Sequence, residues 1–509
     1  MVSRCDVAFS PIQNLPLEII QEIALWAQPE DPNARLDDVP ISMNQVCSSW
    51  QQAISIFPVV WTKLSLILTS GFNLEALRYS LTRYLQRAGE LPITLRLHLY
   101  KPGGLVPDSD SEEALTDEEI TRSRLAHQHA HNAAIDLLTW LFSKENLTCH
   151  IKRLQLITSL RFNHIFPLSS APPDLSKLEF LEIGKIDEDH HDDGVDLGNL
   201  LDRAPSLYKV IILEASLDKN SLEQRLPLPQ LRSLYLSQLL SPIELVNILN
   251  ECPNMQQLRV VLTGPSVWEI SAPVGKHCHL RDLQLYINDE SPDPATVLEL
   301  QIFANLTRLQ LDFSDEYHGY NYDQHLPRPH LNLQNLQRLS IQDMYFTPTN
   351  YLFFFDQCPR LSDLFIVTDI CHITSVAEAF DNPSPDEPRL SLPNLQYLSI
   401  GFLNHPYLDP LSGRYQPPSR TEERDVVSLL DAIHSRTNSC PPNTAPSPEK
   451  CLSKCSLVLS LDEQAESSEM IRERITLLKK LISLEVNGSI TSSSVVLNRT
   501  FGVDDWFED

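Results

Sequence analysis

Glycine is scarce in this sequence, and so are long apolar runs. Only 14 glycines occur among 509 residues, which argues against the Gly-rich loops that hold phosphate groups. The longest apolar runs, such as YLFFF at 351–355, fall far short of the roughly 18–20 residues that a membrane-spanning helix needs. The first residues lack the apolar stretch of a signal peptide. We therefore expect an intracellular protein, cytoplasmic or nuclear, with no membrane partner.

Positive charge is also sparse. The chain has 40 Lys and Arg against 67 Asp and Glu, a formal net charge of -27, and no run of basic residues. Phosphates would be repelled over most of such a surface, so we expect no nucleic-acid partner. The ten cysteines have irregular spacing, which favours buried thiols in a reducing compartment over disulfides.

Motifs for catalysis or cofactor binding are missing as well. The sequence has no G-x-S-x-G, P-loop or H-E-x-x-H motif. Three His-rich stretches and one Cys set could suggest a metal, but adjacent side chains on loops rarely converge, and solvated or buried residues are the favoured interpretation. These candidates are His190/His191, His127/His129/His131, His277/Cys278/His279 and Cys440/Cys451/Cys455. We expect no catalytic, cofactor-binding or metal residues, and a protein that is not an enzyme.

A short apolar pattern recurs along the chain. Its first, fourth and sixth positions are apolar, and successive starts between 151 and 395 lie 24 to 34 residues apart. The last two apolar positions alternate and point to one face of a short strand. The occurrences are Ile151/Leu154/Leu156, Leu178/Leu181/Ile183, Leu207/Val210/Ile212, Leu231/Leu234/Leu236, Met255/Leu258/Val260, Leu280/Leu283/Leu285, Leu306/Leu309/Leu311, Leu336/Leu339/Ile341, Leu361/Leu364/Ile366, Leu395/Leu398/Ile400 and Leu481/Leu484/Val486.

This pattern resembles leucine-rich repeats, which have about 20–29 residues and a strand in each unit. One unit cannot bury its apolar face, whereas stacked units bury a continuous one. Helices are expected between the strands. In 241–254, Ser241 is an N-cap, Pro242 follows, Glu244 completes a capping box, and Ile243, Val246 and Leu249 form the apolar side. The alternative is an unrelated α/β domain with coincidental leucine spacing.

The first 61 residues differ from everything that follows. Leu15-Pro16 starts an Ile-rich helix, and a second helix is expected to carry an apolar stripe from Met43 to Phe57. So few short helices cannot bury two tryptophans and many aliphatic side chains against each other. Part of their surface is therefore expected to face the repeats or another protein.

This module resembles an F-box. The matching elements are the Leu15-Pro16 start, the Ile-rich first helix, Val46-Cys47-x-x-Trp50 and the downstream Trp61. The sequence departs from the motif in a longer loop at 28–40 and in Ser48 and Ser49, where a basic residue is usual. An F-box followed by leucine-rich repeats is similar to the large fungal F-box families. The alternative is an ordinary helical cap on the repeats.

The resemblance implies an α/β fold in which a short helical F-box precedes an irregular leucine-rich-repeat solenoid, with parallel strands on the concave side and helices on the convex side. It also implies a non-catalytic substrate receptor of a ubiquitin ligase, with a Skp adaptor and through it a cullin as partners. Trp50 is expected to matter most for the adaptor contact. The implied adaptor-binding residues are Leu15, Pro16, Ile19, Ile20, Ile23, Val46, Cys47, Trp50, Ile54 and Trp61.

The target is expected to bind on the concave strand face. The net charge favours a protein with a basic surface. The candidate residues alternate with the buried positions of the strands and are Gln155, Glu182, Tyr235, Arg259, Gln284, Gln310, Ser340, Phe365 and Ser399. Two other functions are considered: an interaction scaffold without a ligase role, and an enzyme on a repeat scaffold, for which no motif speaks.

Composition suggests six segments. An acidic loop is expected at 103–123 and a partly disordered Pro/Ser-rich insertion, with a helix near 422–436, at 403–456. The segments are the F-box-like module 1–66, linking helices and a first strand 67–150, the solenoid 151–402, the insertion 403–456, the last repeats 457–490 and an acidic tail 491–509.

Overall fold

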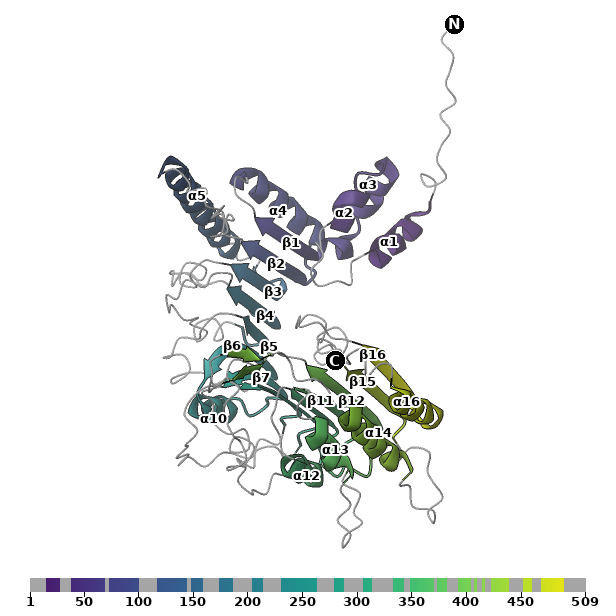
Figure 1. The fold of residues 1–509 in the computed structure, drawn as a ribbon. Coiled ribbons are helices and arrows are strands. Elements are labelled where there is room, and N and C mark those ends of the chain that lie inside the picture. The colour runs from purple at the N-terminus through teal and green to yellow at the C-terminus, as the bar shows by residue number, and fades with distance from the viewer. Residues whose placement is uncertain are drawn as a thin grey trace. The chain divides into compact units, whose positions relative to one another are not determined.

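The chain divides into two compact units, Met1–Gln238 and Leu239–Asp509. Each is α/β, with an open sheet of parallel strands (Figure 1). Within the part of the chain that is described, no helix is both long enough and apolar enough to span a membrane. In the computed structural model, the described residues are 15–27, 38–68, 73–99, 117–143, 148–158, 174–185, 204–213, 230–262, 279–287, 305–313, 333–342, 348–369, 373–381, 392–403, 407–409, 414–416, 423–438, 452–459 and 468–488.

In the first unit, the strands are neighbours in the order in which they occur in the sequence. They are β1 (Lys63–Leu68), β2 (Ile93–Leu99), β3 (Ile151–Thr158), β4 (Phe180–Lys185), β5 (Lys209–Leu213) and β6 (Ser233–Leu240). The alternating leucines, such as Leu95, Leu97, Leu154 and Leu156, are all buried on one face. The first, fourth and sixth positions of the repeat pattern therefore form the core, as the sequence predicts.

The helices of the first unit are α1 (Leu17–Trp26), α2 (Asp38–Met43), α3 (Ser48–Ser55), the 3-10 helix Pro58–Trp61, α4 (Leu74–Ala88) and α5 (Asp117–Phe142). Two expectations need correction. The second helix of the N-terminal module is broken by a turn at 44–47 into α2 and α3. Helix α5 begins at Asp117, so part of the expected loop 103–123 is helical, and residues 103–116 lie outside the described part.

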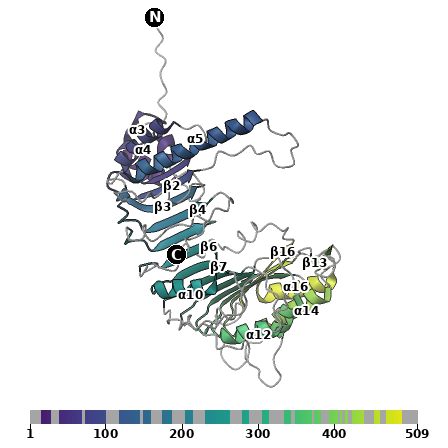
Figure 2. The ribbon, with the colours of Figure 1, turned by 90° about the vertical axis from the view of Figure 1, so that its left-hand side faces the viewer.

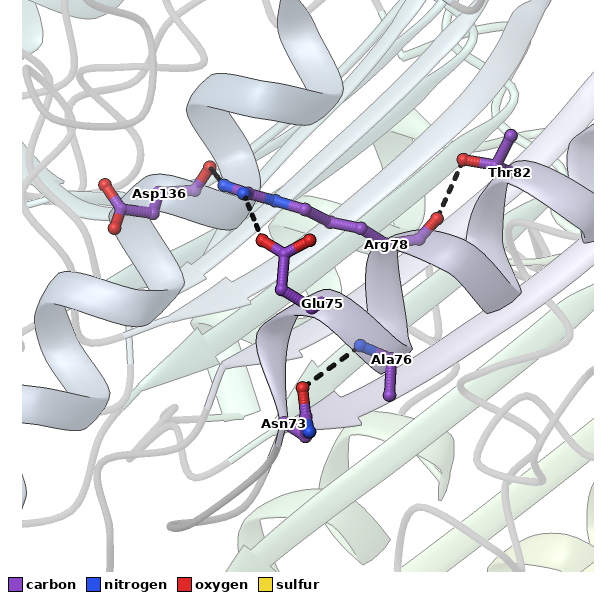
Figure 3. A network of polar contacts seen from close by, with 6 residues as sticks. All are labelled: Asn73, Glu75, Ala76, Arg78, Thr82 and Asp136. Carbon is purple, nitrogen blue, oxygen red and sulfur yellow. Dashed lines mark hydrogen bonds and ion pairs between the residues drawn. The ribbon is translucent and has the colours of Figure 1, made fainter.

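Helix α4 is fixed at its start and against α5 by polar contacts (Figure 3). The Asn73 side chain accepts a hydrogen bond from the Ala76 backbone N–H at 3.1 Å and caps α4. The Arg78 guanidinium donates to the Glu75 carboxylate and to the Asp136 backbone carbonyl oxygen of α5, and each distance is 3.1 Å. One side chain thus joins two helices that are distant in sequence.

The second unit repeats the same parallel plan. Its strands are β7 (Gln257–Leu262), β8 (Asp282–Ile287), β9 (Arg308–Phe313), β10 (Arg338–Gln342), β11 (Asp363–Asp369), β12 (Tyr397–Leu403), β15 (Lys454–Leu459) and β16 (Ser483–Gly488), with a separate hairpin of β13 (Tyr407–Asp409) and β14 (Arg414–Gln416). The helices α12 (Pro348–Gln357), α13 (Ile373–Asp381), α14 (Glu423–Asn438) and α16 (Glu469–Leu481) pack in a row beside these strands (Figures 1 and 2).

Helix α10 (Pro242–Glu251) confirms the predicted cap. The Ser241 hydroxyl accepts a hydrogen bond from the Glu244 backbone N–H, and the Glu244 carboxylate accepts one from the Ser241 N–H at 2.6 Å. Of the expected apolar side, Leu249 is buried as predicted, and the side chains of Ile243 and Val246 lie outside the described part; Leu245 and Ile248 are buried as well.

Backbone hydrogen bonds at the start of each strand repeat through both units. In most repeats two successive N–H groups donate to one carbonyl oxygen of the preceding repeat. For example, Thr307 and Arg308 donate to Arg281 over 2.8 and 2.9 Å, and Gln337 and Arg338 donate to Thr307 over 2.9 and 3.0 Å. The apolar corner residue before the strand closes a turn, as in Leu361 N–H to the Cys358 carbonyl at 3.0 Å. These contacts fix the register of each strand on its neighbour.

The expected segment limits agree with the structure only in part. The limit at 66 cuts through β1, which pairs with β2, and β2 pairs with β3, so the sheet begins well before residue 151. In the expected insertion, the predicted helix is present as α14, while residues 439–451 and the tail 491–509 lie outside the described part.

Candidate functional site

Helix α1 has a buried face and an exposed apolar face. It begins after Pro16, whose carbonyl oxygen accepts hydrogen bonds from the Ile19 and Ile20 N–H groups at 3.1 and 3.2 Å. Glu18 in the first turn favours the helix dipole. Ile20 and Ala24 are buried, whereas Ile19 is 46% exposed. The helix therefore anchors itself with one face and leaves the other open.

The exposed face forms the α1 strip, which consists of Ile19, Ile23 and Trp26. These positions are four and three residues apart and are neighbours on a helix surface. Trp26 is 85% exposed, and Ile23 is exposed as well. Three large apolar side chains thus lie in a row in contact with water, which is the pattern of an interaction surface.

Helices α2 and α3 pack against α1 and add further exposed apolar groups. Val46, just before α3, is 49% exposed, and Ile41 on α2 is exposed too. Cys47 is half-buried, has an extended backbone and occupies the N-cap position of α3. Ile56 and Val59, which follow α3, are also exposed.

Trp61 is an internal anchor of this module. Its indole N–H donates to the Ile54 carbonyl oxygen at 2.7 Å, near the end of α3. Tyr84 of α4 meets the ring edge-on at 5.0 Å, and the Arg87 guanidinium lies 4.3 Å from the ring centre. The Tyr84 hydroxyl in turn donates to the Lys63 carbonyl oxygen at the start of β1. Trp61 therefore ties the N-terminal helices to the sheet.

The ten predicted adaptor-binding residues fall into two groups. Ile20, Trp50, Ile54 and Trp61 are buried within the chain, with Trp50 only 6% exposed, so they can support a surface but cannot form it. The expectation that Trp50 matters most by direct contact is corrected accordingly. The others remain at the surface: Pro16, Ile19, Ile23 and Val46 are exposed, and Leu15 and Cys47 are half-buried.

Sequence reasoning missed Trp26, the most exposed of these apolar residues. The helical spacing Ile19, Ile23, Trp26 could have found it, because a position three residues after Ile23 lies on the same face. The F-box resemblance drew attention to motif positions instead.

No protein-family model matches this chain, and no curated protein does.

A second candidate surface is the open face of the sheet, opposite the buried leucines. The predicted target-binding residues lie in register with one another on it. In the first unit Gln155 pairs with Glu182. In the second unit one row runs through Arg259, Gln284, Gln310, Ser340, Phe365 and Ser399. Tyr235 is opposite Ile211, which is opposite Glu182.

Burial divides this second set as well. Gln284, Gln310 and Ser399 are buried, so they are less accessible than expected. The other six are half-buried. Buried atoms of Gln284 (Oε1), Gln310 (Oε1) and Ser399 (Oγ) have no hydrogen-bond partner.

Glu182 has an unusual electrostatic environment. Burial raises the pKa of its carboxyl group, and a hydrogen bond from Gln155 together with Arg96, Lys209 and Arg153 opposes this effect only in part. The Arg96 guanidinium also donates to the Gln155 side chain. Arg96, Gln155 and Glu182 thus form a polar row across β2, β3 and β4.

Metal binding has no support among the described residues, where no group of three or more His, Cys, Asp or Glu side chains could hold an ion. Among the His and Cys residues considered as metal ligands from the sequence, His129 and His279 are exposed and Cys455 is buried. The 187–194 stretch, Cys278, Cys440 and Cys451 lie outside the described part, as do the side chains of His127 and His131.

Proposed function

We propose that this chain is the substrate-recognition subunit of a Skp-cullin-F-box type ubiquitin ligase. The N-terminal helices dock on the Skp adaptor, and the open sheet face holds a protein target. The chain itself supplies no catalytic group; it raises the effective concentration of a target lysine near the conjugating enzyme.

The α1 strip is the observation that carries this proposal. Covering a large aliphatic side chain stabilises by about 1.5–3 kcal/mol, so a helix that leaves two isoleucines and a tryptophan in water forgoes several kcal/mol unless a partner covers them. The buried Ile20 and Ala24 show that α1 is already docked on its own module, so the strip is available for another protein. Val46 and Ile41 extend the same kind of surface on the neighbouring helices.

The repeats support the other half of the proposal. Parallel strands in sequence order, with 24 to 34 residues between the starts of the repeat pattern and a recurring bond pattern at each strand start, fit an irregular leucine-rich-repeat solenoid that follows an F-box. In such a solenoid the open face is the concave one. It offers polar and aromatic side chains in rows, a surface suited to a protein target.

The test is binding of the full chain to purified Skp adaptor, measured by titration calorimetry. The double variant Ile19→Glu with Ile23→Glu places two carboxylates in the strip. Both isoleucines are partly exposed in the free chain, so each substitution gives up about 1 kcal/mol of binding free energy from covering the isoleucine in the complex. Each new carboxylate also has to lose its bound water when the adaptor covers it. We expect binding to weaken by at least about 100-fold.

Ile67→Glu is the matched control. Ile67 is 40% exposed, comparable to Ile19, but lies on β1 outside the N-terminal helices. This variant should bind the adaptor like the wild type. If the wild-type chain does not bind the adaptor, or if the strip variant binds as well as the control, the ligase role is wrong and an interaction scaffold is the better description.

A further inference from the structure

Three rows of side chains cross the open face of β1 to β5. Paired residues on adjacent strands define each row. The first row is Lys63, Thr94, Arg153, Phe180 and Lys209. The middle row is Ser65, Arg96, Gln155, Glu182 and Ile211. The last row is Ile67, His98, Ile157, Gly184 and Leu213.

The first row is cationic, in contrast to the chain as a whole. Among the fifteen residues of the three rows, four are Lys or Arg and one, Glu182, is acidic, although the chain has a net charge of -27. Arg153 is exposed, and Lys63 and Lys209 are half-buried, so these charges are within reach of a ligand. The expectation of a target with a basic surface, drawn from net charge, does not suit this face.

The corresponding first row of the second unit is different. There, Arg308 lies 3.6 Å from Asp282 and Arg338 lies 3.7 Å from Asp363, so arginine and aspartate neutralise each other across neighbouring strands. In the first unit the place between two cations is taken by the Phe180 ring, with the Arg153 guanidinium 4.6 Å and the Lys209 ammonium 5.7 Å from its centre. The first row thus carries three cations and no acidic side chain, and the single carboxylate of Glu182 in the middle row offsets their charge only in part, so this row attracts an anionic side chain laid over it.

The last row is apolar. Ile67 is exposed and Ile157 and Leu213 are half-buried. Burial lowers the pKa of His98, and the nearby Arg96 lowers it further, so the imidazole favours its neutral form. At Gly184 an added Cβ would lie 3.5 Å from the Ile157 side chain, so the missing side chain leaves the Ile157 surface uncovered.

From these rows we infer that the open face of β1 to β5 binds an extended segment of the target protein that carries acidic residues on one side and apolar residues on the other. The inference rests on the proposed function and adds the chemistry of the target. The acidic side chains lie over Lys63, Arg153 and Lys209, and the apolar ones over Ile67, Ile157 and Leu213.

Strand spacing suggests the pattern of that segment. The cations of the first row and the apolar residues of the last row both occur on β1, β3 and β5, and alternate strands are about 9.6 Å apart. Three residues of an extended polyproline II chain complete one turn and span about 9.3 Å, so every third side chain lies on the same side. A segment that crosses the strands therefore meets one cation and one apolar side chain about every third residue.

The test uses the full chain and a fluorescein-labelled peptide that repeats Glu-Ser-Leu four times, with binding followed by fluorescence anisotropy. The matched peptide has Gln in place of Glu. We expect the Glu peptide to bind at least about tenfold more tightly, and this difference to shrink as salt is added.

Arg153→Gln with Lys209→Gln should weaken binding of the Glu peptide by about tenfold. Lys479→Gln with Lys480→Gln removes the same charge from exposed positions on α16 and should leave binding unchanged. Equal binding of the two peptides, equal weakening by the two double variants, or tighter binding of single-stranded DNA than of the Glu peptide would each overturn the inference.

Adaptor binding of the same preparations separates the two proposals and shows that the variants are folded. Loss of peptide recognition with intact adaptor binding contradicts only the target chemistry. Peptide recognition without adaptor binding supports the target chemistry and contradicts only the ligase role.

Discussion

Replacing Trp61 with phenylalanine tests whether this residue anchors the N-terminal helices to the sheet. The substitution removes the N–H that donates to the Ile54 carbonyl oxygen at 2.7 Å. That oxygen keeps a second hydrogen bond, from the Phe57 N–H at 3.2 Å, so the loss should cost about 1 kcal/mol rather than the larger penalty of an unpaired group. The smaller ring leaves a cavity worth about 1–2 kcal/mol, while the Tyr84 and Arg87 contacts are partly retained. We expect a total loss of about 2–3 kcal/mol.

The assay is urea unfolding of the full chain, followed by far-UV circular dichroism. With a slope of about 2–3 kcal/mol per molar urea, the transition of the first unit should move down by about 1 M. Trp26→Phe is the matched control, because the same chemical change at an 85% exposed side chain should cost less than about 0.5 kcal/mol. Equal midpoints for the two variants would refute the anchoring role.

Three further predictions concern other parts of the molecule. Burial raises the pKa of the Glu182 carboxyl group in the folded protein, so the wild-type protein loses stability as the pH rises and this group must ionise. Glu182→Gln has no such group, and its stability relative to wild type should therefore increase between about pH 4 and about pH 7, measured as urea midpoints. A constant difference would contradict this. Ser241→Ala removes the cap of α10 and should destabilise by about 1 kcal/mol in the same assay, whereas no change would show that the cap is not needed. Burial also raises the pKa of the Cys358 thiol, so iodoacetamide should modify Cys358 far more slowly than the half-buried Cys47, which peptide mass mapping can check; equal rates would contradict the burial.

Local patterns in the sequence predicted the repeats well, because each strand carries its own signal. The buried positions of the strands, the start of α10 and its capping box all depend on residues within a few positions of each other. The helix within the expected insertion, α14, was also found from local composition.

The N-terminal surface was harder to predict, because it depends on which face of each helix packs inward. Ile19 and Ile20 are adjacent isoleucines, and only the packing of α1 on α3 decides that Ile20 is buried and Ile19 exposed. The apolar stripe from Met43 to Phe57 continues through a turn at 44–47, so periodicity alone could not show that two helices share it. The cationic row of the first unit was missed for a related reason: its residues are far apart in sequence and meet only through strand pairing.

The paired N–H contacts at the strand starts have a consequence for how such a chain tolerates change in length. The Ser453 and Lys454 N–H groups both donate to the Gln396 carbonyl oxygen, at 2.9 and 3.1 Å. The Ser453 hydroxyl donates to the same oxygen, although the two residues are 57 positions apart in the sequence. The strand therefore aligns from its first residues, whatever length of chain precedes it. Insertions and deletions between strands can accumulate without shifting the ladder, so the length of the connecting segments can change while the open sheet face stays the same.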